Sequence, residues 1–459
     1  MEQNTPRTRT NRRRKRTRMD VIKEAYLPSI FIGITLVLVL VFIIGAAIRK
    51  SDAPIVQVPP VTTTAPQVDM EALGREAQQL IQQAKVHADN YDYAAAIATL
   101  ENFSGDPMLF TELLNLRDEY RNAQATLVTW SDPSQITCLS VHMLISNPEA
   151  AFADQSYGSA YNRNFITTGE FSQILQQLYN NGYVLVRLSD FSSVTVDAEG
   201  NVVAAAKPLQ LPAGKKPLLL VQTNLSYYQY MSGCGFADRL VLDGEGNLTT
   251  TRVSGDQSGE ITYGMALGEF DMVPILESFI KANPTFSYRG ARAVLAPSGY
   301  DGIFGYRINA SAKATLGAEA YELECANAKA VVDALREAGY ELACYSYANG
   351  NYADMGAAEI QADLQKWAAE IEPILGKTDI LVFPQGTDIG TYDGAKFNVM
   401  QNAGFRYYLG FSSAGVGGNY IAVRRTMITG SELSYNGGRF AGMFDALQLL
   451  DPTRGAVPQ

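Results

Sequence analysis

Residues 215–224 read KKPLLLVQTN, an apolar run that ends in polar side chains. A strand that is apolar on both faces is typical of a parallel sheet covered by helices. Around this run, between residues 134 and 450, short apolar stretches alternate with stretches of helical period. The expected helices lie near residues 167–183, 271–283, 320–338, 357–372 and 394–403. This alternation predicts an α/β fold with parallel strands, arranged as a barrel or as a doubly wound sheet.

In both arrangements a ligand binds where the parallel strands end. Polar and aromatic residues occupy these positions. The candidate ligand-binding residues are His142, Tyr228, Ser346, Tyr347, Gln385, Asp388 and Arg424. The strand ends supply neither two carboxylates in an acid–base arrangement nor a Ser-His-Asp set. Asp388 is the best carboxylate candidate, followed by Asp301.

The first fifty residues predict a membrane anchor. Residues 7–18 hold seven arginines and one lysine, and residues 28–48 form an uncharged apolar run long enough to span a bilayer. Basic residues before a span keep that end in the cytoplasm. We therefore expect a cytoplasmic tail over 1–27, a transmembrane helix over 28–48 and an extracytoplasmic remainder. A cleaved signal peptide is the alternative, but the apolar run is long for one.

The charge of the exported part excludes one class of ligand. Residues 1–50 carry a net charge of +8 against −10 for the whole chain, so residues 51–459 carry −18. This excess argues against nucleic acid and other polyanions, and leaves neutral glycans open. The Pro- and Thr-rich residues 51–68 indicate a semi-extended spacer.

Residues 70–128 predict a short helical segment. Apolar residues recur there every three or four positions, and "NYDYAAAIATL" is similar to the joint of a single tetratricopeptide repeat. One repeat cannot bury its own apolar face, so a collar or stalk is favoured over a peptide-binding array.

The four cysteines, Cys138, Cys234, Cys325 and Cys344, form no CxxC pair, which argues against a zinc site. An extracytoplasmic location permits disulfides, but so low a cysteine density does not require them, and buried free thiols are favoured.

Several stretches together resemble the polysaccharide deacetylase family, the NodB homology domain of carbohydrate esterase type. They are "VHMLI", "YNRNFITTGEFSQILQQLYNNGYVLVRLSDF", "GKKPLLLVQTNLSYYQYM", "LREAGYELACYSYANG", "ILVFPQGTDI" and "MQNAGFRYYLGF", within residues 134–430. The resemblance implies a distorted (β/α) barrel over 134–450. It also implies removal of acetyl groups from cell-wall or surface glycans with a divalent metal such as zinc.

The positions that serve catalysis in that family are all changed in this sequence. The family's general base corresponds to Thr223, and its metal ligands to Asn224, Tyr345 and Asn349. A neutral amide is a weak metal ligand, and a tyrosine must ionise from a pKa near 10 to become a strong one. The strand "IAVRRT" offers no match for the family's late histidine. No cofactor is therefore expected.

Three functions follow from this reading. The first is a pseudoenzyme that binds cell-envelope glycan or an envelope protein with the retained groove. The second is an active carbohydrate deacetylase or hydrolase, acting on C–N or ester bonds with relocated residues such as His142, Asp301 and Asp388. The third is a protein-interaction module that acts through the helices of residues 70–128.

Overall fold

The computed structural model describes residues 69–253 and 265–458. The predicted tail, transmembrane helix and spacer lie outside these ranges. Among the residues described, no helix is both long and apolar enough to cross a bilayer.

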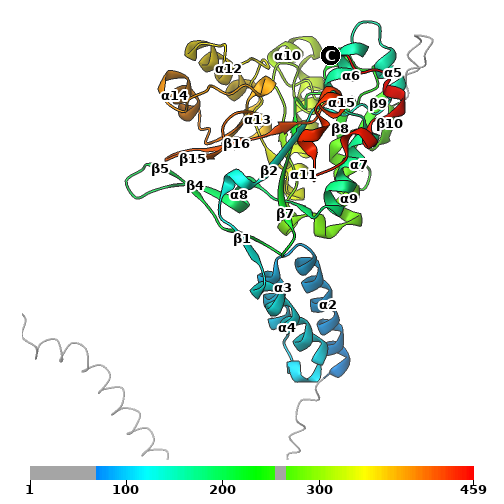
Figure 1. Cartoon of the computed structure of the whole chain (residues 1–459), viewed down its shortest axis with the longest axis vertical. Coiled ribbons are helices and arrows are strands. Elements are labelled where there is room, and N and C mark those ends of the chain that lie inside the picture. Colours follow the sequence, from blue (N-terminus) through cyan, green and yellow to red (C-terminus); the bar gives the residue numbers. More distant parts are fainter. Residues whose placement is uncertain (1–68, 254–264, 459) are drawn as a thin grey trace, which may run out of the picture. The chain divides into compact units, whose positions relative to one another are not determined.

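Three helices form the first part of the described chain (Figure 1). They are α2 (Met70–Asp89), α3 (Tyr93–Glu101) and α4 (Thr111–Ala125). Their shared core is made of Ala77, Ile81, Ala84, Ala96, Leu100, Leu113 and Tyr120. The turn between α2 and α3 contacts the main domain: the Tyr91 hydroxyl donates to the Thr285 carbonyl at 2.9 Å, and Arg289 pairs with Asp92 at 3.3 Å.

The strand β7 (Lys216–Thr223) is the centre of the main sheet, as its apolar sequence predicts. Seven of its eight residues are buried. It pairs in parallel with β2 (Thr137–Val141) on one side. On the other side it pairs with β3 (Tyr183–Leu185) near its start and with β11 (Val294–Ala296) near its end. Further out, β12 (Glu341–Leu342) pairs with β11, and β17 (Thr426–Met427) pairs with β2, both in parallel.

A second sheet contains β13 (Ile380–Val382), β14 (Tyr407–Gly410) and β16 (Ile421–Arg424), all parallel, with the antiparallel β15 (Gly415–Val416) at its edge. A parallel bridge between Cys344 and Leu381 joins it to the first sheet. On the other side the chain runs from β16 directly through Arg425 into β17. The predicted α/β class is confirmed. The parallel strands fall into two of the five sheets of the described chain rather than into one continuous ladder.

Every second residue along the strands of the two sheets points to the inner face, and these side chains pack in one buried core. It includes Cys138, Leu219, Val221, Val294, Ala296, Ala343, Tyr345, Val382, Leu409, Ile421 and Val423. Because side chains alternate along a strand, the residue two positions beyond each of these continues on the same face. The helices bury the opposite face in a larger core that contains Leu139, Phe171, Leu218 and Leu220.

The larger helices connect the strands in the predicted order (Figure 1). They are α7 (Thr168–Asn180), α9 (Met272–Ala282), α11 (Ala318–Ala338), α12 (Ala357–Glu370) and α14 (Gly394–Asn402). Shorter helices are α5 (Pro148–Ala153), α6 (Gly158–Asn164), α8 (Leu188–Phe191), α10 (Ala310–Leu316), α13 (Glu372–Leu375) and α15 (Gly430–Tyr435). The remaining strands are β1 (Val128–Trp130), β4 (Ser192–Val196), β5 (Val202–Ala206), β6 (Leu209–Leu211), β8 (Arg239–Leu242), β9 (Leu248–Val253) and β10 (Met265–Gly268). All four cysteines are free thiols.

A buried ion pair ties the C-terminal segment to α7. The guanidinium of Arg454 donates to both oxygens of the Glu170 carboxylate, at 2.8 and 2.5 Å. Their side chains are 2% and 0% exposed. Glu170 also closes a capping box by accepting the N–H of Thr167 at 2.8 Å. The pair therefore links the end of the chain to the start of a core helix.

We predict that Arg454→Met lowers the free energy of unfolding by about 3–5 kcal/mol, because it leaves the Glu170 carboxylate buried without its cation. The matched control is Arg439→Met. Arg439 pairs with Glu432 at 2.7 Å, but its side chain is 54% exposed. Its loss should cost about 0–1 kcal/mol. Chemical denaturation measures both, and equal costs would contradict the assignment.

Candidate functional site

The parallel strands end at a common edge, where their inner-face side chains converge. Four side chains at this edge each lie two positions beyond a buried inner-face residue. They are His142 after Ser140, Thr223 after Val221, Tyr345 after Ala343 and Arg425 after Val423. Tyr345 and Arg425 are only 2% exposed, and Thr223 is fully buried. The floor of the site thus consists of one imidazole, two hydroxyl groups and one guanidinium.

The hydrogen bonds of Thr223 fix the tautomer of His142. The Thr223 hydroxyl lies 3.1 Å from the Val141 carbonyl, which can only accept, and 2.9 Å from Nδ1 of His142. Its single proton goes to the carbonyl, so Nδ1 of His142 carries a hydrogen and Nε2 keeps its lone pair. Burial, together with the positive charge of Arg425, lowers the pKa of His142 to about 4, although a hydrogen bond with the Thr223 backbone opposes the change. His142 is therefore neutral at pH 7.

Arg425 joins the two sheets through neutral acceptors. Its Nη1 donates to the Ser140 hydroxyl at 3.0 Å, and its Nη2 donates to the Phe383 carbonyl at 2.8 Å. Its backbone N–H donates to the Gly410 carbonyl at 2.8 Å. Burial lowers the pKa of Arg425, and the nearby Tyr345 hydroxyl opposes that change. A guanidinium keeps its proton even when buried, so a fixed positive charge stands beside His142 and Tyr345.

Asn224 and Tyr228 form a second group at the end of β7. The Tyr228 hydroxyl donates to the Asn224 side-chain oxygen and lies 2.6 Å from the Ser298 hydroxyl. The buried Tyr228 ring stacks between the rings of Tyr230 and Tyr300, at centroid distances of 5.6 and 5.1 Å. Both outer rings are exposed. The stack thus presents flat aromatic faces at the rim of the site.

The loop after β12 is held by α12. Both oxygens of the Asp363 carboxylate accept backbone N–H groups at 2.8 Å, from Tyr347 and Ala348. The Ser346 hydroxyl accepts the N–H of Gly350 at 3.0 Å. The side-chain oxygen of Asn349 is buried and has no hydrogen-bond partner among the described residues. Ser346 is therefore a bracing residue of the loop, while Asn349 keeps an unused acceptor.

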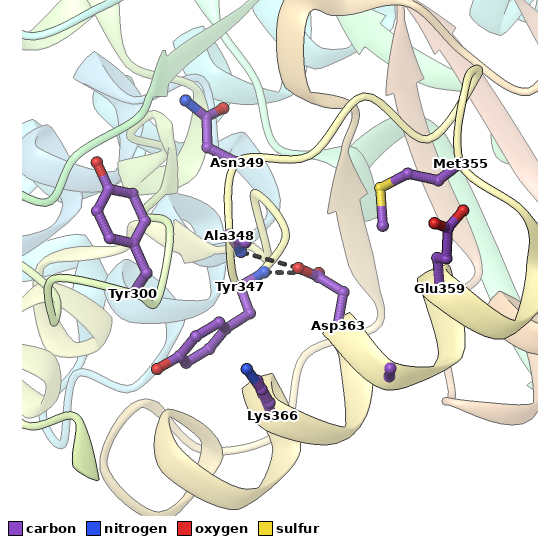
Figure 2. A pocket seen from close by; sticks show the side chains of 9 residues that line it. Tyr300, Tyr347, Ala348, Asn349, Met355, Glu359, Asp363 and Lys366 are labelled. Atoms are coloured by element: carbon purple, nitrogen blue, oxygen red, sulfur yellow. Dashed lines mark hydrogen bonds between the residues drawn. The ribbon is translucent and has the colours of Figure 1, made fainter. Parts of the chain in front are cut away.

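The same loop forms one wall of a pocket of about 680 Å³. Figure 2 shows its lining, in which Asp363 holds the loop and the Asn349 amide points away from Glu359 and Lys366. The remaining lining residues are Tyr300, Tyr347, Ala348, Met355 and Ala362. The Tyr347 hydroxyl donates to Glu370 at 2.7 Å, and this bond together with burial raises the pKa of Tyr347. Tyr300 belongs both to the pocket lining and to the aromatic stack, so the two features are adjacent.

The family's metal positions do not fit a divalent cation here. The Asn224 oxygen is engaged by Tyr228, and the Tyr345 hydroxyl accepts the backbone N–H of Gln385 at 3.1 Å. The positive charge of Arg425 beside Tyr345 would repel a second cation. Within the described ranges, no cluster of three or more His, Cys, Asp or Glu side chains could hold a metal ion.

The remaining candidates, Asp388, Asp301 and Gln385, do not form an acid–base pair with one another. Asp388 is 5% exposed, and its oxygens accept the N–H groups of Gly390 and Ser413 at 2.9 and 3.2 Å. Asp301 pairs with Arg307 at 3.2 Å. Both carboxylates thus brace loops. Gln385 is exposed, with its backbone φ at 58°.

Arg424 is exposed, and it is the neighbouring Arg425 that enters the site. Arg425 lies on the same strand face as Ile421 and Val423, and the structure shows that this face is the buried inner one. Asp271 was also missed. It is fully buried and accepts from the Tyr227 hydroxyl at 2.5 Å and from Gln222 at 2.8 Å. Burial raises the pKa of Asp271 to about 6. No sequence signal marks it, since its partners come from distant segments.

Comparison with solved structures gives several similar chains, and three of them are described below. No family model and no curated protein matches the sequence. A Streptococcus pyogenes deacetylase, PplD, in complex with acetate is 11% identical with a TM-score of 0.34, over 70% of this chain and 100% of that one. A de-N-acetylase from Aggregatibacter actinomycetemcomitans is 12% identical with a TM-score of 0.35, over 69% and 99%. The BpsB deacetylase domain of Bordetella bronchiseptica is 15% identical with a TM-score of 0.33, over 65% and 98%.

We predict that His142 destabilises the protein in acid. The pKa of His142 is about 4 in the folded chain and about 6.5 when unfolded, so the unfolded chain takes up the proton first. Its contribution to stability is complete above pH 6.5 and is lost as the pH falls toward 4. By about 1.36 kcal/mol per pKa unit, the loss is roughly 3 kcal/mol.

Chemical denaturation between pH 7 and pH 4 should show this loss in the wild type and in His87→Asn, an exposed control. The loss should be absent in His142→Asn, which keeps a donor toward Thr223. Because the chain has two histidines, NMR can follow the His142 ring directly. A titration midpoint near 6.5 for that ring would contradict the prediction.

Proposed function

We propose that this chain is a membrane-anchored, extracytoplasmic polysaccharide deacetylase-like protein that has lost metal-dependent catalysis and binds cell-envelope glycan at the strand edge. The observation that carries the proposal is the composition of the site floor. A metal-dependent deacetylase needs anionic or imidazole ligands for its metal and a base for its water. The floor instead holds the Thr223 hydroxyl, the Tyr345 hydroxyl, one neutral imidazole and the buried cation of Arg425.

The geometry of the rim supports retained binding. Five residues other than glycine adopt a left-handed backbone in the strand-end loops: Asn224, Tyr227, Ser346, Asn349 and Gln385, with φ between 47° and 60°. Each such residue costs of order 1–3 kcal/mol, and strain of this kind concentrates at ligand sites. The exposed rings of Tyr230 and Tyr300 offer the flat apolar faces on which sugar rings stack.

The finer architecture belongs to the same proposal. We regard the strands as a distorted (β/α) barrel, whose two sheets approach each other at the Cys344–Leu381 bridge and at Arg425. Residues 28–48 would anchor it in the cell membrane with the N-terminus in the cytoplasm. Residues 51–68 and the three helices of 70–128 would hold the barrel away from the bilayer.

The first test is the metal content of the full-length protein, purified in a mild detergent. After incubation with zinc, cobalt or nickel at neutral pH and desalting, mass spectrometry should find far less than one metal ion per chain. One tightly held ion per chain would contradict the proposal. Release of acetate from acetylated wall glycan would then be the next assay.

A restoration series tests why the metal is absent. We predict that Thr223→Asp, Asn224→Asp, Tyr345→His and Asn349→His together restore only weak zinc binding, because Arg425 stays beside the new ligands. Adding Arg425→Gln should strengthen zinc binding roughly tenfold or more, since it removes a like charge from a buried site. Adding Arg424→Gln to the four changes is the matched control and should have little effect. Equal zinc affinity in the two five-residue variants would show that Arg425 does not oppose the metal.

The aromatic rim gives a prediction for binding. We expect Tyr300→Ala to weaken binding of a soluble wall-glycan fragment by about 0.5–1.5 kcal/mol, because a stacking face is lost. Tyr435 is an exposed tyrosine outside the strand-end loops, and Tyr435→Ala should leave affinity unchanged. Isothermal titration calorimetry measures both, and equal affinities in the two variants would remove Tyr300 from the site.

A further inference from the structure

Arg425 is a buried cation without an anionic partner. Two arginines are buried in the part of the chain that the structure describes, Arg425 at 2% and Arg454 at 3% exposure. Arg454 is neutralised by Glu170, whereas Arg425 forms no salt bridge with any described carboxylate. Its Nε is buried and has no hydrogen-bond partner there. The guanidinium thus keeps both an uncompensated charge and an unused donor.

An unpaired, buried guanidinium of this kind favours the binding of an anion from outside the protein. Removing a charge from water is costly unless an opposite charge or a full set of hydrogen bonds replaces the solvent. Arginine cannot escape the cost by losing its proton. A ligand oxyanion at Nε would supply both missing elements, and planar carboxylates match the geometry of the guanidinium.

We propose that Arg425 binds the carboxylate of a single acidic sugar residue, such as a hexuronic acid, within the otherwise neutral glycan that occupies the strand edge. This inference rests on the proposed function and narrows its ligand class. A single cation suits a carboxylate better than a phosphate dianion. The other groups of the floor add no positive charge, because His142 is neutral at pH 7 and the neighbouring Arg424 is exposed.

Phe411 controls access to this cation. The guanidinium carbon of Arg425 lies 4.5 Å from the centre of the Phe411 ring, and Phe411 is 41% exposed. The ring therefore separates one face of the guanidinium from solvent. It also lies directly against Gly386, where a β-carbon would collide with it. Truncation of this ring should expose the cation without removing any of its hydrogen bonds.

The test uses the full-length protein and two disaccharides. One is glucuronic acid joined to N-acetylglucosamine, and the other is its neutral glucose analogue. Calorimetry should show at least tenfold tighter binding of the acidic probe to the wild type and to Arg424→Gln. Arg425→Gln should abolish this preference. If Arg425→Gln does not fold, Phe411→Ala decides: it should bind the acidic probe at least threefold more tightly than the wild type.

Several outcomes would overturn the inference. Equal affinity for the two disaccharides would refute the role of Arg425 and leave glycan binding in place. So would an acid preference that survives Arg425→Gln, or a Phe411→Ala protein with no gain in affinity. Inorganic phosphate that displaces the acidic probe more effectively than free glucuronate would also refute the carboxylate assignment.

The NMR signal of His142 shows whether the anion site at Arg425 and the proposed glycan binding fail together or separately. A shift of the His142 signal with free glucuronate, without binding of either disaccharide, would support the anion site and refute the glycan function. Absence of any shift and any binding would overturn both.

Discussion

The hydrogen bonds of Arg425 are the constraint on which the strand edge depends. Arg425 lies between β16 and β17. Its side chain donates hydrogen bonds to Ser140, within β2, and to Phe383, the residue that follows β13. Its backbone N–H bonds to Gly410 at the end of β14. This side chain thus links the two sheets, together with the Cys344–Leu381 bridge. Because the link is a cation, it also sets the electrostatics of the site that the sheets enclose.

The charge of Arg425 explains the chemistry of its neighbours. It lowers the pKa of His142 together with burial, so the imidazole stays neutral and Nε2 remains an acceptor. It lies beside the Tyr345 hydroxyl, at a position where the deacetylase family uses a metal ligand. A floor of this kind suits the proposed binding of oxygen-rich or anionic groups and lacks the paired ligands that would hold a metal. The proposed loss of catalysis and the proposed binding role therefore have one physical origin.

Sequence patterns predicted the class of fold and the places where its strands end. The apolar run of β7, the helix near residues 167–183 and the positions of the strand ends all follow from local rules, and the structure has them. The roles within the site were harder to predict. Asp388 and Ser346 accept backbone N–H groups and brace their loops, which depends on the path of each loop. Asp271 depends on partners from three segments, so no local pattern marks it.

The sequence by itself determined the order of strands and helices, and the absence of acidic or imidazole side chains at the family's metal positions. These follow from residue type and from periods of two and 3.6 residues, which are properties of neighbouring positions. Only the tertiary structure decided that Arg425 rather than Arg424 enters the site, and that this charge has no carboxylate beside it in the described chain. Burial and pairing of a charge depend on groups that folding brings together, and Ser140 and Arg425 are 285 positions apart.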